Sequence, residues 1–180
     1  HCGQQLYTLR STRKLTKGEK IHAGGFGPSA TGKPQVIIQF DGSCKMARTA
    51  YAAAGAGIVA YHIDSEQRMR MLQKQAQPLA RLQDAAEAEA AGAAHSVLLA
   101  HQLTQQFPLA THEYIVQGDN SPVIRHLEGK AGFKSLIILE LLDEAKVLLR
   151  YRLDSVRFEY LPREANKVAD ALAGIASDLQ

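Results

Sequence analysis

The chain has 180 residues, of which 46% are hydrophobic and 22% are charged. This balance is typical of one globular domain with an additional segment, and it excludes a wholly disordered chain. No apolar run reaches the roughly 18 residues that a membrane span requires, so we expect no integral membrane protein and no membrane partner. The two cysteines, Cys2 and Cys44, are too few for a disulfide framework, and we expect a reducing, intracellular setting.

The net charge of +3 is unevenly distributed along the chain. Residues 1–34 carry six basic side chains and one acidic one, whereas residues 35–180 carry fifteen basic and seventeen acidic ones. The segment 23–34 (AGGFGPSATGKP) has the glycine and proline content of a linker. We therefore predict a basic, glycine-rich N-terminal arm or linker over 1–34 and a folded domain over 35–180. The arm suits contact with a polyanion, and a solvated linker accounts for it equally well.

Hydrophobic periodicity predicts a mixed α/β fold after the arm. In chain order, it indicates strands at 36–40, at 54–61 and within 66–78, a helix at 82–103, a strand at 114–117, helices at 121–128 and 133–151, a strand at 156–160 and a final helix at 164–178. The first three strands suit antiparallel hairpins, whereas the later ones need helical crossovers. We therefore expect a mixed five-stranded sheet flanked by helices.

Four acidic residues lie at the ends of these elements or within apolar stretches. Asp41 and Asp119 each follow a predicted strand, whereas Glu89 and Asp170 lie in the first and last of the long helices. An acid in apolar surroundings is costly unless it pairs or binds a cation. Together they suggest one cation site, and oxygen ligands suit Mg²⁺ or Mn²⁺. Individually, each acid is also explained as a turn residue, a helix cap or an exposed side chain.

Four motifs surround these acids. DGS at 41–43 is expected to end a strand, AEAAG at 88–92 to lie on a helix and GD at 118–119 to end a later strand, and PREANKVADALA follows at 162–173. In this order the motifs resemble the type 1 ribonuclease H family, particularly its plant-like and retroelement-associated branch. The last segment matches that family's C-terminal signature at every defined position. The resemblance covers roughly residues 35–178, and it implies a ribonuclease H-like fold.

The resemblance also implies an activity, which is cleavage of the RNA strand of an RNA–DNA hybrid with two Mg²⁺ or Mn²⁺ ions about 3.5–4 Å apart. By analogy, Asp41 would bridge both ions, Asp119 and Asp170 would hold the ion on the nucleophile side, and Glu89 would hold the other. The implied contacts to substrate 2′-hydroxyls or phosphates are Gly42, Ser43, Asn120 and Asn166. The parent is implied to be a retroelement-type polyprotein, in which a reverse transcriptase domain shares the polypeptide.

Two glutamates on the first long helix compete for the inward position. Steps of three and four from Glu89 reach apolar residues such as Val97, whereas steps from Glu87 reach polar residues such as Gln83. We therefore expect Glu89 to face the sheet and Glu87 to face solvent. Asp84 favours Glu87 instead, because the family often has an asparagine three residues before its glutamate. Asp84 is equally a good helix N-cap.

Tyr160 departs from the family pattern. Many members have a histidine ten residues before the last aspartate, where it assists proton transfer and product release. A tyrosine titrates at about pH 10 and cannot replace it near neutrality. The alternative is therefore a catalytically weak or inactive domain that binds hybrid, or a structural module of a reverse transcriptase. The basic candidates for nucleic-acid contact are Arg125, Lys130, Lys134, Arg163 and Lys167.

Overall fold

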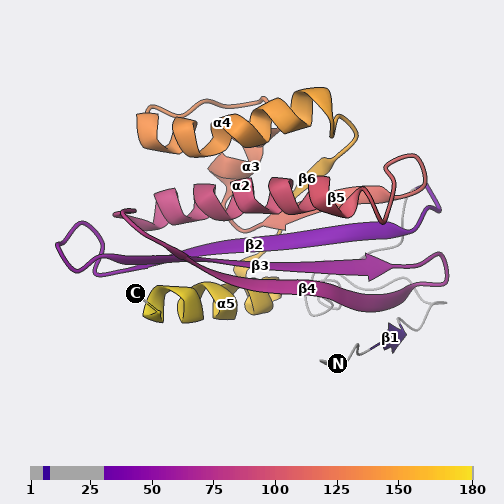
Figure 1. The fold of residues 1–180 in the computed structure, drawn as a ribbon, viewed down its shortest axis with the longest axis horizontal. Coiled ribbons are helices and arrows are strands. Elements are labelled where there is room, and N and C mark those ends of the chain that lie inside the picture. Colours follow the sequence, from indigo (N-terminus) through magenta and orange to yellow (C-terminus); the bar gives the residue numbers. More distant parts are fainter. Residues whose placement is uncertain (1–5, 9–30, 180) are drawn as a thin grey trace.

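The computed structural model describes residues 6–8 and 31–179, so most of the predicted arm lies outside the described residues (Figure 1). The described elements are β1 (Leu6–Thr8), β2 (Gln35–Lys45), β3 (Ala53–Ile63), β4 (Arg68–Leu79), α2 (Ala85–Leu103), β5 (Glu113–Gly118), α3 (Ser121–Leu127), α4 (Leu136–Tyr151), β6 (Arg157–Tyr160), the 3₁₀ turn η1 (Arg163–Ala165) and α5 (Lys167–Asp178). None of the helices in this part of the chain is long and apolar enough to span a bilayer.

The strands form one mixed sheet in the order β1-β4-β3-β2-β5-β6. β2, β3 and β4 are antiparallel neighbours, whereas β5 is parallel to β2 and β6 is parallel to β5. The predicted mixed five-stranded sheet is confirmed. The three residues of β1 add a short sixth strand, because they pair antiparallel with the first residues of β4.

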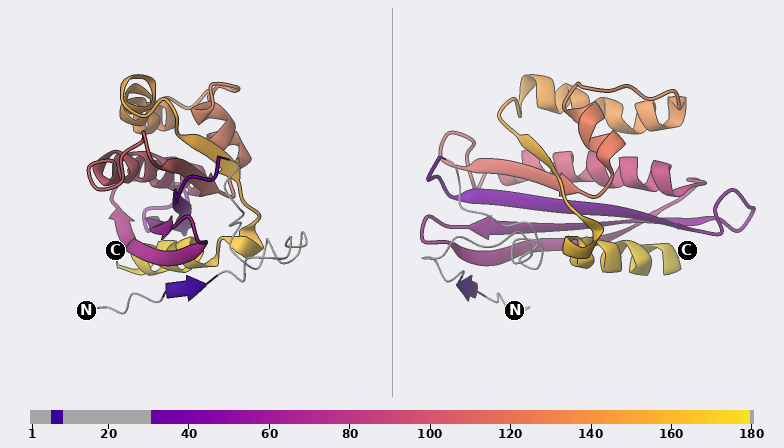
Figure 2. Two further views of the ribbon diagram at one scale, coloured as in Figure 1. Left: turned by 90° about the vertical axis from the view of Figure 1, so that its right-hand side faces the viewer. Right: turned by 180° about the vertical axis from the view of Figure 1, so that it is seen from behind.

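Helices cover both faces of the sheet, with α2 and α4 on one side and α5 on the other (Figures 1 and 2). Alternate residues of β2 supply both cores, as the two-residue period of a strand requires. Val36 and Phe40 belong to the large cluster shared with α2 and α4, whereas Ile37 belongs to a smaller cluster that includes Ala169 of α5. The sheet is therefore the middle of three layers.

Two glycines bring helices directly onto the strands. A Cβ at Gly57 of β3 would lie 2.0 Å from the carbonyl oxygen of Ala169 in α5. A Cβ at Gly42 of β2 would lie 2.2 Å from the backbone nitrogen of Glu89 in α2. Because neither distance is possible for real atoms, these positions require glycine. Both helices that carry predicted site acids therefore lie against the centre of the sheet.

Several predicted boundaries change for identifiable reasons. The first strand does not end at DGS 41–43 but continues to Lys45, because β3 pairs with it residue by residue as far as Ala53. The connection between β2 and β3 therefore spans only residues 46–52. α4 begins at Leu136, where Ser135 caps the helix by accepting a hydrogen bond from the third residue after it. The predicted final helix divides into η1 and α5.

Candidate metal centre

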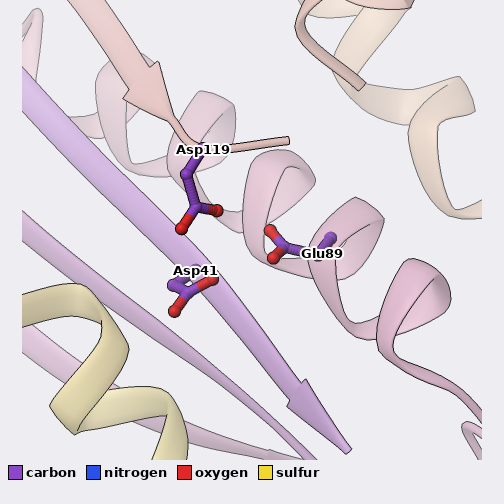
Figure 3. Close-up of side chains that lie close together, drawn as sticks. All are labelled: Asp41, Glu89 and Asp119. Carbon is purple, nitrogen blue, oxygen red and sulfur yellow. The ribbon is translucent and has the colours of Figure 1, made fainter. Parts of the chain in front are cut away.

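Three acidic side chains converge from three separate elements (Figure 3). Asp41 lies in β2, Glu89 in α2 and Asp119 directly after β5, and one carboxylate oxygen from each lies within 4.8 Å of the other two. The parallel pairing of β2 with β5 explains why Asp41 and Asp119 are close. Phe40 pairs with Gly118, and the two aspartates are the residues that follow this pair. The close approach of α2 at Gly42 brings the third.

Few hydrogen bonds from the described residues satisfy the oxygens of this acidic triad. Asp41 is only 4% exposed, and its Oδ1 accepts a hydrogen bond of 2.9 Å from the backbone N–H of Gly42. Oε2 of Glu89 is buried and has no hydrogen-bond partner among the described residues. A buried acceptor without a donor, beside two further carboxylates, is the arrangement that a bound cation satisfies. The all-oxygen donor set therefore fits Mg²⁺ or Mn²⁺.

The pKa values of the triad reflect this crowding. Burial raises the pKa of Asp41 from 3.8 to about 7, and the nearby Asp170 and Asp119 carboxyls add to the rise. Burial, followed by the hydrogen bond to Asp41 and its charge, raises the pKa of Glu89 from 4.5 to about 10. Burial also raises the pKa of Asp119, although the charge of Arg163 opposes the shift. Without a cation, burial and mutual repulsion therefore favour the protonated forms of these carboxyls.

A family model described as reverse transcriptase-like matches residues 39–176, which include all three acids. The chain belongs to the reverse transcriptase-like family. Its fold is that of ribonuclease H, as the sequence motifs predict. No curated protein matched in the sequence comparison.

Solved structures with this fold include cellular and viral proteins. The N-terminal RNase H domain of a Mycobacterium tuberculosis protein is 24% identical, with a TM-score of 0.65 over 81% of this chain and 94% of that one. LC11-RNase H1 in complex with an RNA/DNA hybrid is 22% identical, with a TM-score of 0.61 over 81% of this chain and 98% of that one. The RNase H domain of PFV, a prototype foamy virus, is 20% identical, with a TM-score of 0.60 over 84% and 99%. At these identities the likeness shows the fold alone.

Asp170 of this reverse transcriptase-like domain lies at the rim of the site. It is in the first turn of α5, and its carboxylate is outside the group of three that converge within 4.8 Å. It is near enough to Asp41 to raise the pKa of that carboxyl. Its Oδ1 also lies 3.9 Å from Nη2 of Arg163, and its side chain is 49% exposed. The four predicted acids therefore form a buried triad with a fourth acid beside it.

The predicted solvent position of Glu87 is wrong. Glu87 is buried, and its carboxylate accepts a hydrogen bond of 2.8 Å from the backbone N–H of Gln83. Its own N–H donates to Asp84, which is the N-cap of α2. The prediction assumed that the polar face of the helix is exposed to solvent. Because α2 lies between the sheet and α4, its first turns are covered on more than one side. Glu87 therefore belongs to the start of the helix, and Glu89 is the glutamate of the triad.

The predicted substrate contacts divide into two groups. Gly42, Ser43 and Asn120 are partly exposed beside the triad, and Asn120 also caps α3 through its Oδ1. Asn166 is fully buried instead, and its Nδ2 donates a hydrogen bond of 2.8 Å to the carbonyl oxygen of Phe40. It therefore faces the protein interior, which corrects the prediction that it contacts substrate. No sequence signal marks this bond, because its two residues are 126 positions apart.

Proposed function

We propose that this domain is a metal-dependent endoribonuclease that hydrolyses the RNA strand of RNA–DNA hybrids. The observation that carries the proposal is the convergence of Asp41, Glu89 and Asp119 within 4.8 Å, with a buried carboxylate oxygen that has no partner in the described part of the chain. LC11-RNase H1 and a foamy viral protease-reverse transcriptase of the same fold have been solved with RNA/DNA hybrid, which supports this substrate class.

The triad would hold two Mg²⁺ or Mn²⁺ ions, with Asp170 completing the site from α5. Bound in this way, the ions would activate a water and stabilise the leaving 3′-oxygen during in-line displacement at phosphorus. Asp41 would be the best placed to contact both ions, because all three other acids are near enough to affect its pKa and its Oδ1 is oriented by the Gly42 N–H. Glu89 must release its proton before it can act as a ligand, so binding is expected to strengthen as pH rises.

Recognition of the hybrid would come from groups around the triad. The partly exposed Ser43 and the amide nitrogen of Asn120 are proposed to contact 2′-hydroxyls or phosphates. Arg163 and Lys167, both exposed near the rim, are proposed to contact the phosphate backbone. We further propose that the domain acts inside the cell as part of a retroelement-type polyprotein that includes a reverse transcriptase.

A second function is favoured by one observation. Tyr160 is 57% exposed at the end of β6, at the position where many family members carry histidine. Without that imidazole, the domain would bind the hybrid and cut it slowly or not at all, as a structural module of a reverse transcriptase would. The retained triad favours the enzyme, since a structural role alone requires no cluster of repelling acids.

The deciding experiment incubates the purified chain with labelled RNA–DNA hybrid, double-stranded RNA or double-stranded DNA, in Mg²⁺, Mn²⁺ or EDTA. We expect metal-dependent cutting of the RNA in the hybrid alone, abolished in Asp41→Asn. Glu89→Gln and Glu87→Gln form a matched pair, of which only the first should abolish cutting. Asp143→Asn, an exposed acid on α4, is the control and should cut normally. Binding without cutting in either metal would favour the second function.

A further inference from the structure

Asn166 occupies the position of a helix cap and does not act as one. It directly precedes α5, yet its side chain makes no capping hydrogen bond. The residues in the same position before α2, α3 and α4, which are Asp84, Asn120 and Ser135, all cap their helices through side-chain oxygens. Asparagine is among the best N-cap residues, so the absence of a cap here requires an explanation.

The side chain of Asn166 bonds to β2 instead of capping α5, and this arrangement lowers the stability of the fold. It is completely buried, and its Nδ2 donates to the carbonyl oxygen of Phe40, whereas its Oδ1 is buried with no hydrogen-bond partner among the described residues. An uncapped helix and an unpaired buried oxygen both destabilise a fold. Local rules of this kind are broken mainly where function requires it.

The hydrogen bonds of Asn166 connect two acids of the site. Phe40 directly precedes Asp41, and the pairing of β2 with β5 ends there, opposite Gly118. On its other side, the backbone carbonyl of Asn166 accepts a hydrogen bond of 3.0 Å from the N–H of Asp170. A single residue therefore links the backbone next to Asp41 with the backbone of Asp170, the acid that lies outside the triad.

We propose that Asn166 is a positioning residue that fixes Asp170 relative to Asp41 and thereby sets the affinity for the second of two cations. The inference rests on the proposed function only in requiring that divalent cations bind the triad. Outer contacts that orient metal ligands typically change metal affinity about 10–100-fold when removed. The side chain of Asp170 is about half exposed, so burial does not hold it in place as it holds Asp41 and Glu89. The hydrogen bonds of Asn166 restrict the position of Asp170 instead.

The test measures Mn²⁺ binding by calorimetry and thermal stability in EDTA. In Asn166→Ser the side chain is too short to reach Phe40, and the buried amide oxygen without a partner among the described residues is removed as well. We expect a melting temperature close to that of the parent and Mn²⁺ binding weakened about 10-fold at one of two sites. In the Asp170→Asn background the same change should have no further effect, because the acid that it positions is gone.

Two controls separate positioning from a purely structural role. Ser135→Ala removes the cap of α4 and should lower the melting temperature without changing Mn²⁺ affinity. Asn166→Asp keeps the shape of the side chain and loses the donor, and it replaces the serine variant if that variant does not fold. If neither Asn166 variant folds in EDTA, or if Asn166→Ser binds Mn²⁺ as the parent does, the positioning role is overturned. No Mn²⁺ binding to the parent chain would instead overturn the metal centre itself, and the positioning role with it.

Discussion

Removal of the negative charge at Asp41 should stabilise the metal-free protein at neutral and alkaline pH. Asp41 is 4% exposed, and its pKa rises from 3.8 to about 7 in the fold. A raised pKa means that the folded state holds its proton longer than the unfolded chain, so stability is lost as pH rises from about 4 through about 7. At about 1.4 kcal/mol per pH unit, the ionised group costs up to about 4 kcal/mol. Because the neighbouring acids share this cost, we expect Asp41→Asn to gain about 1–3 kcal/mol at pH 8.

The assay is urea unfolding in EDTA at pH 4, 6 and 8, with the exposed Asp143→Asn as control. The stability gap between Asp41→Asn and the parent should be largest at pH 8 and close to zero at pH 4. Saturating Mg²⁺ should stabilise the parent and leave the variant unchanged, which would offset most or all of this gap, because a ligand of the folded state adds about 2.7 kcal/mol at 100 times its dissociation constant. A variant that is no more stable than the parent at pH 8, or a gap that is independent of pH, would refute the electrostatic reasoning.

Three further predictions concern the surroundings of the triad. Gly57→Ala should lower the free energy of unfolding by about 1–3 kcal/mol in urea, because its Cβ would overlap α5, whereas Gly132→Ala, with open space around it, should not. Arg163→Gln should weaken hybrid binding in Ca²⁺ and lower the slope of log K against log salt by about 1 in fluorescence anisotropy, and an unchanged slope would argue against a phosphate contact. Tyr160→His should raise the cleavage rate near neutral pH in a pH–rate profile, and an unchanged rate would remove the reason to expect a slow enzyme.

Local chemistry made much of the fold predictable. β-branched runs marked the strands, and alanine-rich or amphipathic stretches marked the helices, because both patterns follow from which face of an element is buried. The boundaries were less predictable. β2 runs beyond Asp41 to Lys45 because a neighbouring strand pairs with it there, and that partner is invisible in the local pattern.

In the candidate site, too, some residues were predictable from the sequence and others were not. The motifs named Asp41, Glu89 and Asp119, and the structure brings their carboxylates within 4.8 Å of one another. The helical period placed Glu87 in solvent, whereas the start of α2 is covered and Glu87 accepts a backbone hydrogen bond there. The family resemblance implied that Asn166 contacts substrate, whereas its side chain is buried and donates to the carbonyl oxygen of Phe40.

The sequence alone thus determined the family, the element order and the residue types of a cation site, because these depend on short motifs and on periodicity. Only the tertiary structure decided which acids form the buried triad, why Glu87 is buried at the start of α2 and why Asn166 leaves α5 uncapped. Each of these depends on a contact between distant segments, such as the bond from Asn166 to Phe40 across 126 residues. The tertiary structure also bears on the uneven charge of the chain. The excess of acidic residues over 35–180 includes the three carboxylates that β2, β5 and α2 bring together.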